Sequence, residues 1–183
     1  MKKSKVKPFI DKFPLRTERT QIRLLNKKDC RWYAEEVHKE YYTEYSDNKA
    51  ATTLKVDHIK NRLYTLIDSI RHTHEFNYEL RTVAIHRDTH EPCGGVNIHP
   101  TDYSGEVEIS YWVKPEYQHN GLATEIVKGV INSIFTIKEL NEIKIVIQSS
   151  NIASIIVAER LGARYMYSVD GRYDKNLVYR IRK

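Results

Sequence analysis

The chain has 183 residues, of which 40% are hydrophobic and 30% are charged, as in an ordinary globular protein with room for one buried core. No apolar run approaches the length of a membrane span, and the first residues lack the apolar segment of a signal peptide. Cys30 and Cys93 form no metal-binding or redox motif. We therefore expect a single domain, with no membrane-spanning segment, in the reducing cytoplasm.

The formal net charge of +6 is concentrated at the N-terminus. Residues 1–20 contain seven Lys or Arg and two Asp or Glu, which is a net charge of +5, so the rest of the chain is close to neutral. Such an arm is typical either of a segment that contacts RNA, the ribosome or a membrane surface, or of a solubilising and flexible leader. The second interpretation is the more common one. The predicted organisation is thus a basic leader over residues 1–16 and one domain over residues 17–183.

The first half of that domain reads as one strand followed by two helices. Residues 20–25 alternate in the manner of a strand, and Asn26 is a typical cap for a helix that continues to about Tyr41. Residues 54–72 repeat apolar side chains at helical spacing. Between Asp29 and Asp47, acidic and aromatic residues predominate, which suggests either a mouth for a cationic amine or an ordinary solvated helix face.

The second half is richer in strands. Glu106 to Val113 alternates with period two, which places Glu106, Glu108, Ser110 and Trp112 on one face. The other predicted strands cover residues 80–86, 94–99, 142–148, 164–169 and 176–181, and the predicted helices cover residues 121–135 and 151–161, the latter ended by Gly162. A strand, a helix and a second strand of these lengths indicate a parallel pair of strands with a right-handed crossover.

The stretch after Val113 has the features of a phosphate-binding turn. The strand ends near Pro115, a polar turn contains Gly121, and an amphipathic helix begins immediately afterwards. The first N–H groups of a helix lack partners inside it, and the helix dipole adds partial positive charge there. Together these features predict a site for a phosphate group.

Two blocks resemble motifs of one known family. Gln118, Gly121 and Ala123 resemble the Q-x-x-G-x-(G/A) loop of the GNAT superfamily of acetyl-CoA-dependent N-acyltransferases, and Asn151 with Ser154 is similar to the block that follows its next strand. The resemblance covers roughly residues 17–182 and is strongest to the bacterial ribosomal-protein N-terminal acetyltransferases. It implies an α/β (α+β) GNAT fold, a mixed central sheet whose parallel central strands splay apart, flanked by about four helices.

The resemblance also implies a binding site for acetyl-CoA. The expected cofactor contacts come from the loop and the strand before it, and they are Trp112, Val113, Gln118, His119, Asn120, Gly121, Leu122, Ala123 and Thr124. Asn151 would reach the pantetheine amides, cap its own helix, or do both. Relatives often carry Arg or Lys between the Gln and the Gly, where this chain has His119 and Asn120. That departure removes a cationic contact but keeps the backbone cradle.

Two residues are the candidates for acid–base chemistry. Glu108 lies close to where the family often carries a glutamate and is the candidate base, with Glu106 as a competitor on the same face. Ser154 is the candidate proton donor to the CoA sulfur, because Ala158 stands where other branches carry a tyrosine acid. Three alternatives stay open: Glu108 is a solvated strand residue, Ser154 only bonds backbone, or the acceptor amine arrives already neutral.

We therefore expect an N-acetyltransferase that moves an acetyl group from acetyl-CoA to a primary amine, with a protein or peptide N-terminus as first choice. A small amine, such as an aminoglycoside, a polyamine or an amino-acid derivative, is the alternative acceptor, and a non-catalytic CoA-binding or ribosome-associated module is the alternative class. A ribosome contact through the basic leader and a homodimer remain open, and no membrane partner is expected. No metal is expected, since the eight histidines show no ligand spacing.

Overall fold

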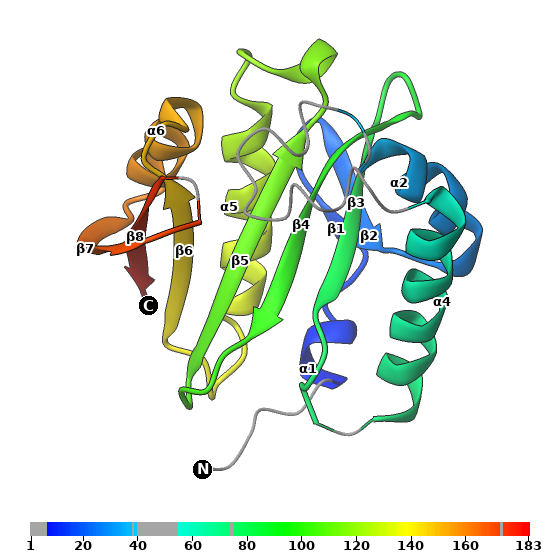
Figure 1. The fold of residues 1–183 in the computed structure, drawn as a ribbon, viewed down its shortest axis with the longest axis horizontal. Helices are drawn as coiled ribbons and strands as arrows, with labels where there is room; N and C mark the ends of the chain where they lie inside the picture. The colour runs from blue at the N-terminus through cyan, green and yellow to red at the C-terminus, as the bar shows by residue number, and fades with distance from the viewer. Residues whose placement is uncertain (1–6, 38, 40–54, 74, 173) are drawn as a thin grey trace.

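The computed structural model describes residues 7–37, 39, 55–73, 75–172 and 174–183, which form one eight-stranded mixed sheet with helices on both faces (Figure 1). The spatial order of the strands is β1-β2-β3-β4-β5-β6-β8-β7. The strands are β1 (Leu15–Arg16), β2 (Thr20–Leu24), β3 (Leu80–His86), β4 (Pro92–Pro100), β5 (Glu106–Val113), β6 (Glu142–Gln148), β7 (Arg164–Asp170) and β8 (Lys175–Arg182). The helices are α1 (Lys7–Ile10), α2 (Cys30–Glu36), α4 (Val56–His72), α5 (Leu122–Ile134) and α6 (Ile152–Arg160), with short 3₁₀ turns η1 (Lys27–Asp29) and η3 (Pro115–Tyr117).

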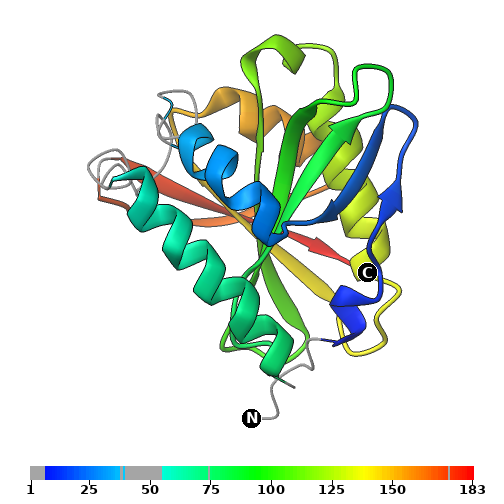
Figure 2. The same ribbon diagram turned by 90° about the vertical axis from the view of Figure 1, so that its right-hand side faces the viewer.

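Two hydrophobic clusters hold the helices to opposite faces of the sheet (Figure 2). The larger cluster joins the inner face of α5 to the sheet through residues such as Ile109 and Val127. The smaller cluster joins α2 and α4 to the sheet, and Trp112 belongs to it. The predicted alternation of β5 is therefore correct, because its odd and even positions serve different clusters.

The sheet opens between its two parallel central strands. β5 pairs with β6 only from Glu106 to Ile109, opposite Glu142 to Ile145. Beyond that point β5 stays paired with β4 as far as Val113, while β6 stays paired with β8 as far as Gln148. The two halves of the sheet thus diverge toward the carboxyl ends of β5 and β6, which confirms the predicted splayed GNAT sheet.

The element boundaries depart from the prediction mainly in the first helix. Asn26 caps η1, as expected of a cap, through its side chain and the N–H of Lys28 at 2.9 Å. Helix α2 then ends at Glu36 rather than near Tyr41, and residues 38 and 40–54 lie outside the described part of the chain. The second helix begins at Val56, with Lys55 as its cap.

The expected basic leader is folded wherever the structure describes it. Phe9 in α1 is 1% exposed, belongs to the larger hydrophobic cluster and stacks on Phe76 with ring centroids 4.4 Å apart. β1 pairs with β2 through Leu15 and Arg16. Residues 7–16 of the predicted leader are therefore packed against the domain, because apolar side chains among the lysines give this segment a face to bury.

Candidate functional site

The loop between β5 and α5 presents an open backbone at a helix N-terminus. Gly121 is the N-cap of α5 and has a left-handed φ of 81°, a conformation that favours glycine. A Cβ added at Gly121 would meet nothing within 4 Å, so the backbone faces open space. Helix α5 has 13 residues, which is long enough to give its N-terminus a substantial dipole. This turn therefore has the form of an anion site.

The side chains of the loop fix its shape rather than project from it. Gln118 Nε2 donates to the carbonyl oxygen of Val113 at 2.8 Å, and Asn120 Oδ1 accepts from the N–H of Leu122 at 3.1 Å. The side chain of Leu122 is buried in the larger cluster. Among the residues expected to hold the cofactor, these three would therefore act through the loop conformation and backbone.

A partly buried ion pair anchors the loop to the start of the domain, and sequence reasoning missed it. Arg19 Nε lies 2.6 Å from Glu125 Oε2, the Arg19 N–H donates to Glu125 Oε1 at 2.8 Å, and Arg19 Nη1 donates to the Asn120 carbonyl at 3.1 Å. Burial raises the pKa of Glu125, but hydrogen bonds from Thr17 and Arg19 outweigh it, and the net pKa is lowered. Glu125 thus stays ionised and the turn is rigidly held.

The end of β5 offers backbone rather than side chains. Trp112 packs edge-on against Tyr33 with ring centroids 5.9 Å apart, and Val113 belongs to the larger cluster. The expected role of both residues, backbone pairing with the pantetheine arm, is compatible with these positions. Thr124, on the first turn of α5, has a buried hydroxyl without a hydrogen-bond partner in the described part of the protein. The open turn and the parted strands together fit a pyrophosphate with an extended arm.

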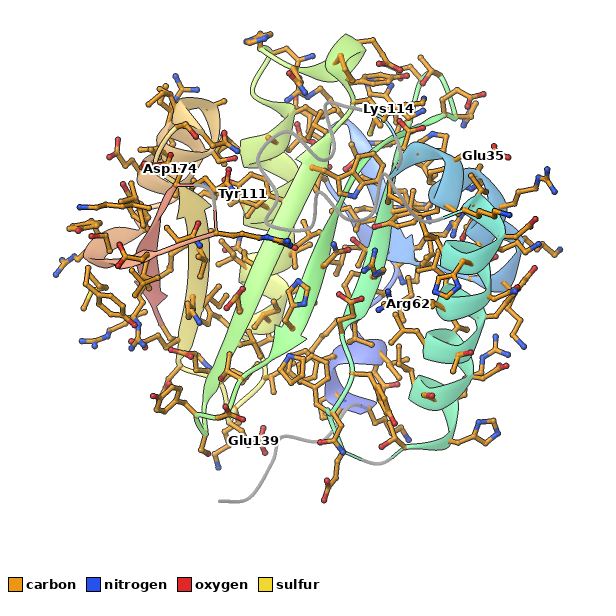
Figure 3. All side chains as sticks on the ribbon, viewed as in Figure 1. Glu35, Arg62, Tyr111, Lys114, Glu139 and Asp174 are labelled. Carbon is orange, nitrogen blue, oxygen red and sulfur yellow. The ribbon has the colours of Figure 1, made fainter. Side chains whose placement is uncertain are left out.

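The start of α6 is connected to β5 across the opening. Asn151 Oδ1 accepts from the N–H of Ser154 at 3.0 Å, so Asn151 caps its helix, as one of the two open interpretations expected. The Tyr111 hydroxyl, on the side of β5 toward α6, donates to the carbonyl oxygen of Ser154 at 3.0 Å (Figure 3). Burial raises the pKa of Tyr111 to about 12, so it remains a neutral donor. Ser154 is partly buried and lies beside the opening.

Glu108, the candidate base, is paired with a lysine of the neighbouring strand. Lys144 Nζ lies 2.8 Å from Glu108 Oε2, and the two residues are partners in the β5–β6 ladder. Burial lowers the pKa of Lys144, but its hydrogen bond and attraction to Glu108 outweigh this effect and raise it overall. Lys144 is therefore a cation at neutral pH and occupies one side of the Glu108 carboxylate.

Glu106, the competing carboxylate, is the first residue of β5, at the end of the strand away from Val113. Its side chain is buried, and Arg180 Nη2 lies 3.1 Å from Glu106 Oε2. Burial raises the pKa of Glu106, and the neighbouring carboxylate of Glu142 adds to the shift. A hollow of about 590 Å³ opens here, lined by Tyr103, Ser104, Glu106, Asn141, Glu142, Arg180, Arg182 and Lys183. Its lining residues include the amino ends of β5 and β6. The turn at Gly121 instead follows the carboxyl end of β5, at the opposite end of the sheet (Figure 1).

The acidic stretch from Asp29 to Asp47 has two open interpretations, a mouth for a cationic amine and a solvated helix face, and only its first part lies in the described residues. Arg23 binds Asp29 through its two terminal guanidinium nitrogens, Nη1 at 2.6 Å and Nη2 at 2.9 Å. Glu36 is buried and lies 2.9 Å from Lys39 Nζ. The acidic and aromatic residues from Glu40 to Asp47 are outside the described part of the chain.

Within the described part of the chain, no three His, Cys, Asp or Glu side chains are grouped to hold a metal ion, and the absence of a metal stays a prediction.

Comparison with known proteins assigns the family. The family model of the acetyltransferase (GNAT) domain matches residues 19–164, and the chain belongs to this family. Its relative YoaA of Bacillus subtilis, named as an uncharacterized N-acetyltransferase, is 32% identical over 105 residues, which is 53% of this chain and 59% of that protein. The chain thus spans less than two thirds of this relative. No described helix is both long and apolar enough to cross a membrane.

Solved structures share the fold but act on different amines. The ribosomal-protein-S5-alanine acetyltransferase of Vibrio fischeri superposes with a TM-score of 0.75 at 18% identity, over 91% of this chain and 94% of that one. Spermidine N-acetyltransferase of Vibrio cholerae, solved with CoA and spermine, also gives a TM-score of 0.75, at 19% identity, over 90% and 95%. These likenesses confirm the fold and leave the acceptor open.

Proposed function

We propose that this protein is an acetyl-CoA-dependent N-acetyltransferase whose cofactor lies on the turn at Gly121 and in the opening between β5 and β6. The observation that carries the proposal is the coincidence of these two features. The open backbone of Gly121 stands at the N-terminus of α5. It lies after the end of the strand whose pairing with β6 stops at Ile109. A phosphate bound at the turn would direct the pantetheine arm into the opening.

The chain supplies the reacting end of this site from three elements. We propose that the backbone of Trp112 and Val113 positions the pantetheine arm, with loop residues His119, Asn120, Ala123 and Thr124 around the phosphates. Ser154, at the opening on α6, would donate a proton to the departing sulfur. Glu108 faces the acceptor side, where its charge would attract an ammonium group. Lys144 Nζ lies 2.8 Å from Glu108 Oε2, so Glu108 would act as a base through Oε1, or through Oε2 once the substrate displaces Lys144.

The acceptor that we propose first is the N-terminal amine of a protein or peptide. Its support is the motif resemblance to the ribosomal-protein branch. A small amine is the second candidate, supported by the equally similar fold of the spermidine enzyme. The polar face that carries Glu79 and Glu108 suits a cation of either kind.

An acetylation panel tests both the activity and the acceptor. Short peptides beginning with alanine or serine, spermidine and an aminoglycoside are each incubated with acetyl-CoA, and the acetylated products are measured by mass spectrometry. We expect a kcat/KM for at least one peptide that is about tenfold or more above that of the small amines. Turnover of small amines alone would contradict the first choice. Binding of acetyl-CoA without any turnover would favour a non-catalytic CoA-binding module. In that case Ser154→Ala would bind acetyl-CoA as wild type does, and neither protein would acetylate an amine.

We retain three further expectations as proposals. A cytoplasmic location is supported by Cys30 and Cys93, which are both free and buried. A homodimer is supported by the edge strand β7, where Tyr165, Met166 and Tyr167 are exposed. A ribosome contact would use the basic side chains near the N-terminus.

A further inference from the structure

Three polar side chains on the α2 and α4 face of the sheet form a chain of contacts that has no part in the acid–base roles proposed above. His99 Nε2 on β4 lies 3.0 Å from Ser110 Oγ on β5. His99 Nδ1 lies 3.3 Å from Glu79 Oε2 in the segment before β3. A hydroxyl, an imidazole and a carboxylate in this order can pass a proton from one end to the other.

The neighbouring contacts fix the direction of these hydrogen bonds. Asn97 Nδ2 donates to Ser110 Oγ at 3.4 Å, which leaves the single Ser110 proton free to be donated to His99 Nε2. Arg81 Nη2 lies 2.6 Å from Glu79 Oε1, and Glu79 Oε2 faces His99 Nδ1, where a carboxylate oxygen accepts from Nδ1–H. Burial lowers the pKa of His99, so the ring is neutral at neutral pH, and with Nδ1–H facing Glu79 its lone pair is on Nε2, the side that faces Ser110.

The position of Ser110 puts this lone pair beside the proposed chemistry. Ser110 is the first residue of β5 beyond the last pair with β6, Ile109 opposite Ile145. Ser110 shares its face of β5 with Glu108, because the two residues are two apart in a strand. His99 is on the same face, because it is the partner of Glu108 in the β4–β5 ladder. The side chain of His99 remains 31% exposed. A group that reaches the opening from this face can thus meet the Ser110 hydroxyl.

Three charged groups act on the imidazole, and a fourth, Lys144, is the ion-pair partner of one of them. Glu79 and Arg81 lie on the β3 side, and Glu108 with its partner Lys144 lies on the β5 and β6 side. Burial lowers the pKa of His99, and the attraction of Glu79 and Glu108 opposes this without cancelling it. The folded-state pKa is therefore below the ordinary value of 6.5, and His99 becomes able to accept a proton as the pH rises through that lower value.

We propose that Ser110 and His99 form the proton relay that deprotonates the acceptor ammonium, with Glu79 holding the imidazole in its accepting tautomer. This inference rests on the proposed function. As the nitrogen–carbon bond forms and the carbon–sulfur bond breaks, the ammonium loses two protons. One passes to Ser110 Oγ while the Ser110 proton moves to His99 Nε2, and from there it returns to solvent. The other ends on the thiolate, so the products are an amide, a thiol and one released proton.

The first test is the pH profile of kcat/KM with whichever of an alanine-initiated peptide and spermidine the wild type acetylates. Wild type should show an acidic limb below pH 6.5, set by the enzyme. His99→Gln should lower kcat/KM by about 100-fold, in the range of a lost general base. It should also move the limb to the ionisation of the free amine, which for a peptide N-terminus is about 7.7–8.0.

Matched variants separate the relay from its surroundings. His58→Gln removes an exposed histidine of α4 and should leave the profile unchanged. Glu108→Gln should lower turnover while leaving the acidic limb in place, because Glu108 is not in the relay. The proposal would be overturned in favour of Glu108 if the acidic limb below pH 6.5 stayed in place in His99→Gln. It would be overturned in the same way if that limb were lost in Glu108→Gln.

A second readout does not depend on turnover. The imidazole signals of His99, identified by their loss in His99→Gln, are followed by NMR as the pH is changed. We expect titration below pH 6.5, and a further fall in the pKa in Glu79→Gln, since a neutral amide no longer attracts the imidazolium. A His99 pKa at or above 6.5, or one indifferent to Glu79→Gln, would refute the relay. Absence of acetyl transfer by wild type would instead count against the proposed function.

Discussion

Asn151 stabilises the helix that carries Ser154. Its side chain accepts the Ser154 N–H at 3.0 Å, one of the donors that a helix start leaves without an internal partner. Asn151→Ala should lower the free energy of unfolding by about 1 kcal/mol, the usual cost of a lost N-cap. Urea unfolding followed by circular dichroism measures this. Equal stability of Asn151→Ala and wild type would mean that the cap contributes nothing.

Single residues show where sequence reasoning stops. Period two places Glu108, Ser110 and Trp112 on one face of β5, and the structure agrees. The partners Lys144 and His99 could not be predicted, because they depend on the register of β5 with its two neighbours. A shift of one residue in either ladder would turn those side chains to the other face.

At the scale of elements, Tyr111 is the contact that joins β5 to α6 where the two strands part. Its hydroxyl donates to the Ser154 carbonyl at 3.0 Å from a largely buried position. Tyr111→Phe should reduce stability by about 1 kcal/mol, the typical net worth of one hydrogen bond. Amide exchange in the first turn of α6 should become faster, since this turn loses its tie to the sheet.

The control for that variant is Tyr117→Phe. The hydroxyl of Tyr117 contacts Thr89 Oγ1 at 3.0 Å in an exposed position, so its removal should change neither stability nor exchange in α6. Equal exchange rates in α6 of Tyr111→Phe and wild type would show that the helix is held by packing alone.

Strands were easier to predict than the first helix and the N-terminal segment. β3, β5 and β6 have the predicted bounds, because runs of alternating β-branched residues leave little choice of structure. Helix α2 ends earlier than its helical spacing indicates. The positive charge of the N-terminal segment suggested a leader apart from the domain, but Phe9 is buried among the core residues despite the surrounding lysines. The splay itself came from family resemblance, since no residue pattern in β5 or β6 encodes where their pairing stops.

At the scale of the whole molecule, two half-sheets meet along a short parallel ladder and separate beyond it. Each half has continuous antiparallel pairing up to the opening, so the opening is a stable feature of the fold rather than a missing contact. Helix α5 begins at the same end, with its turn anchored to residues 17–19 through Glu125. A ligand that spans turn and opening should therefore stabilise the whole domain rather than one element.

Thermal unfolding with and without acetyl-CoA tests most directly whether acetyl-CoA binds at the Gly121 turn. Gly162 supplies the matched control, because its φ of +80° and the open space around its missing Cβ equal those of Gly121, while it lies at the far end of α6. Gly121→Glu and Gly162→Glu should thus carry similar backbone strain.

We predict that acetyl-CoA at about 100 times its dissociation constant adds ~2.7 kcal/mol to the stability of wild type and of Gly162→Glu. For a protein of this size the rise in Tm is roughly 5–10 °C. Gly121→Glu should show no rise, and ATP should produce little in any variant. No rise in wild type at millimolar acetyl-CoA, or an equal rise in Gly121→Glu, would contradict the account.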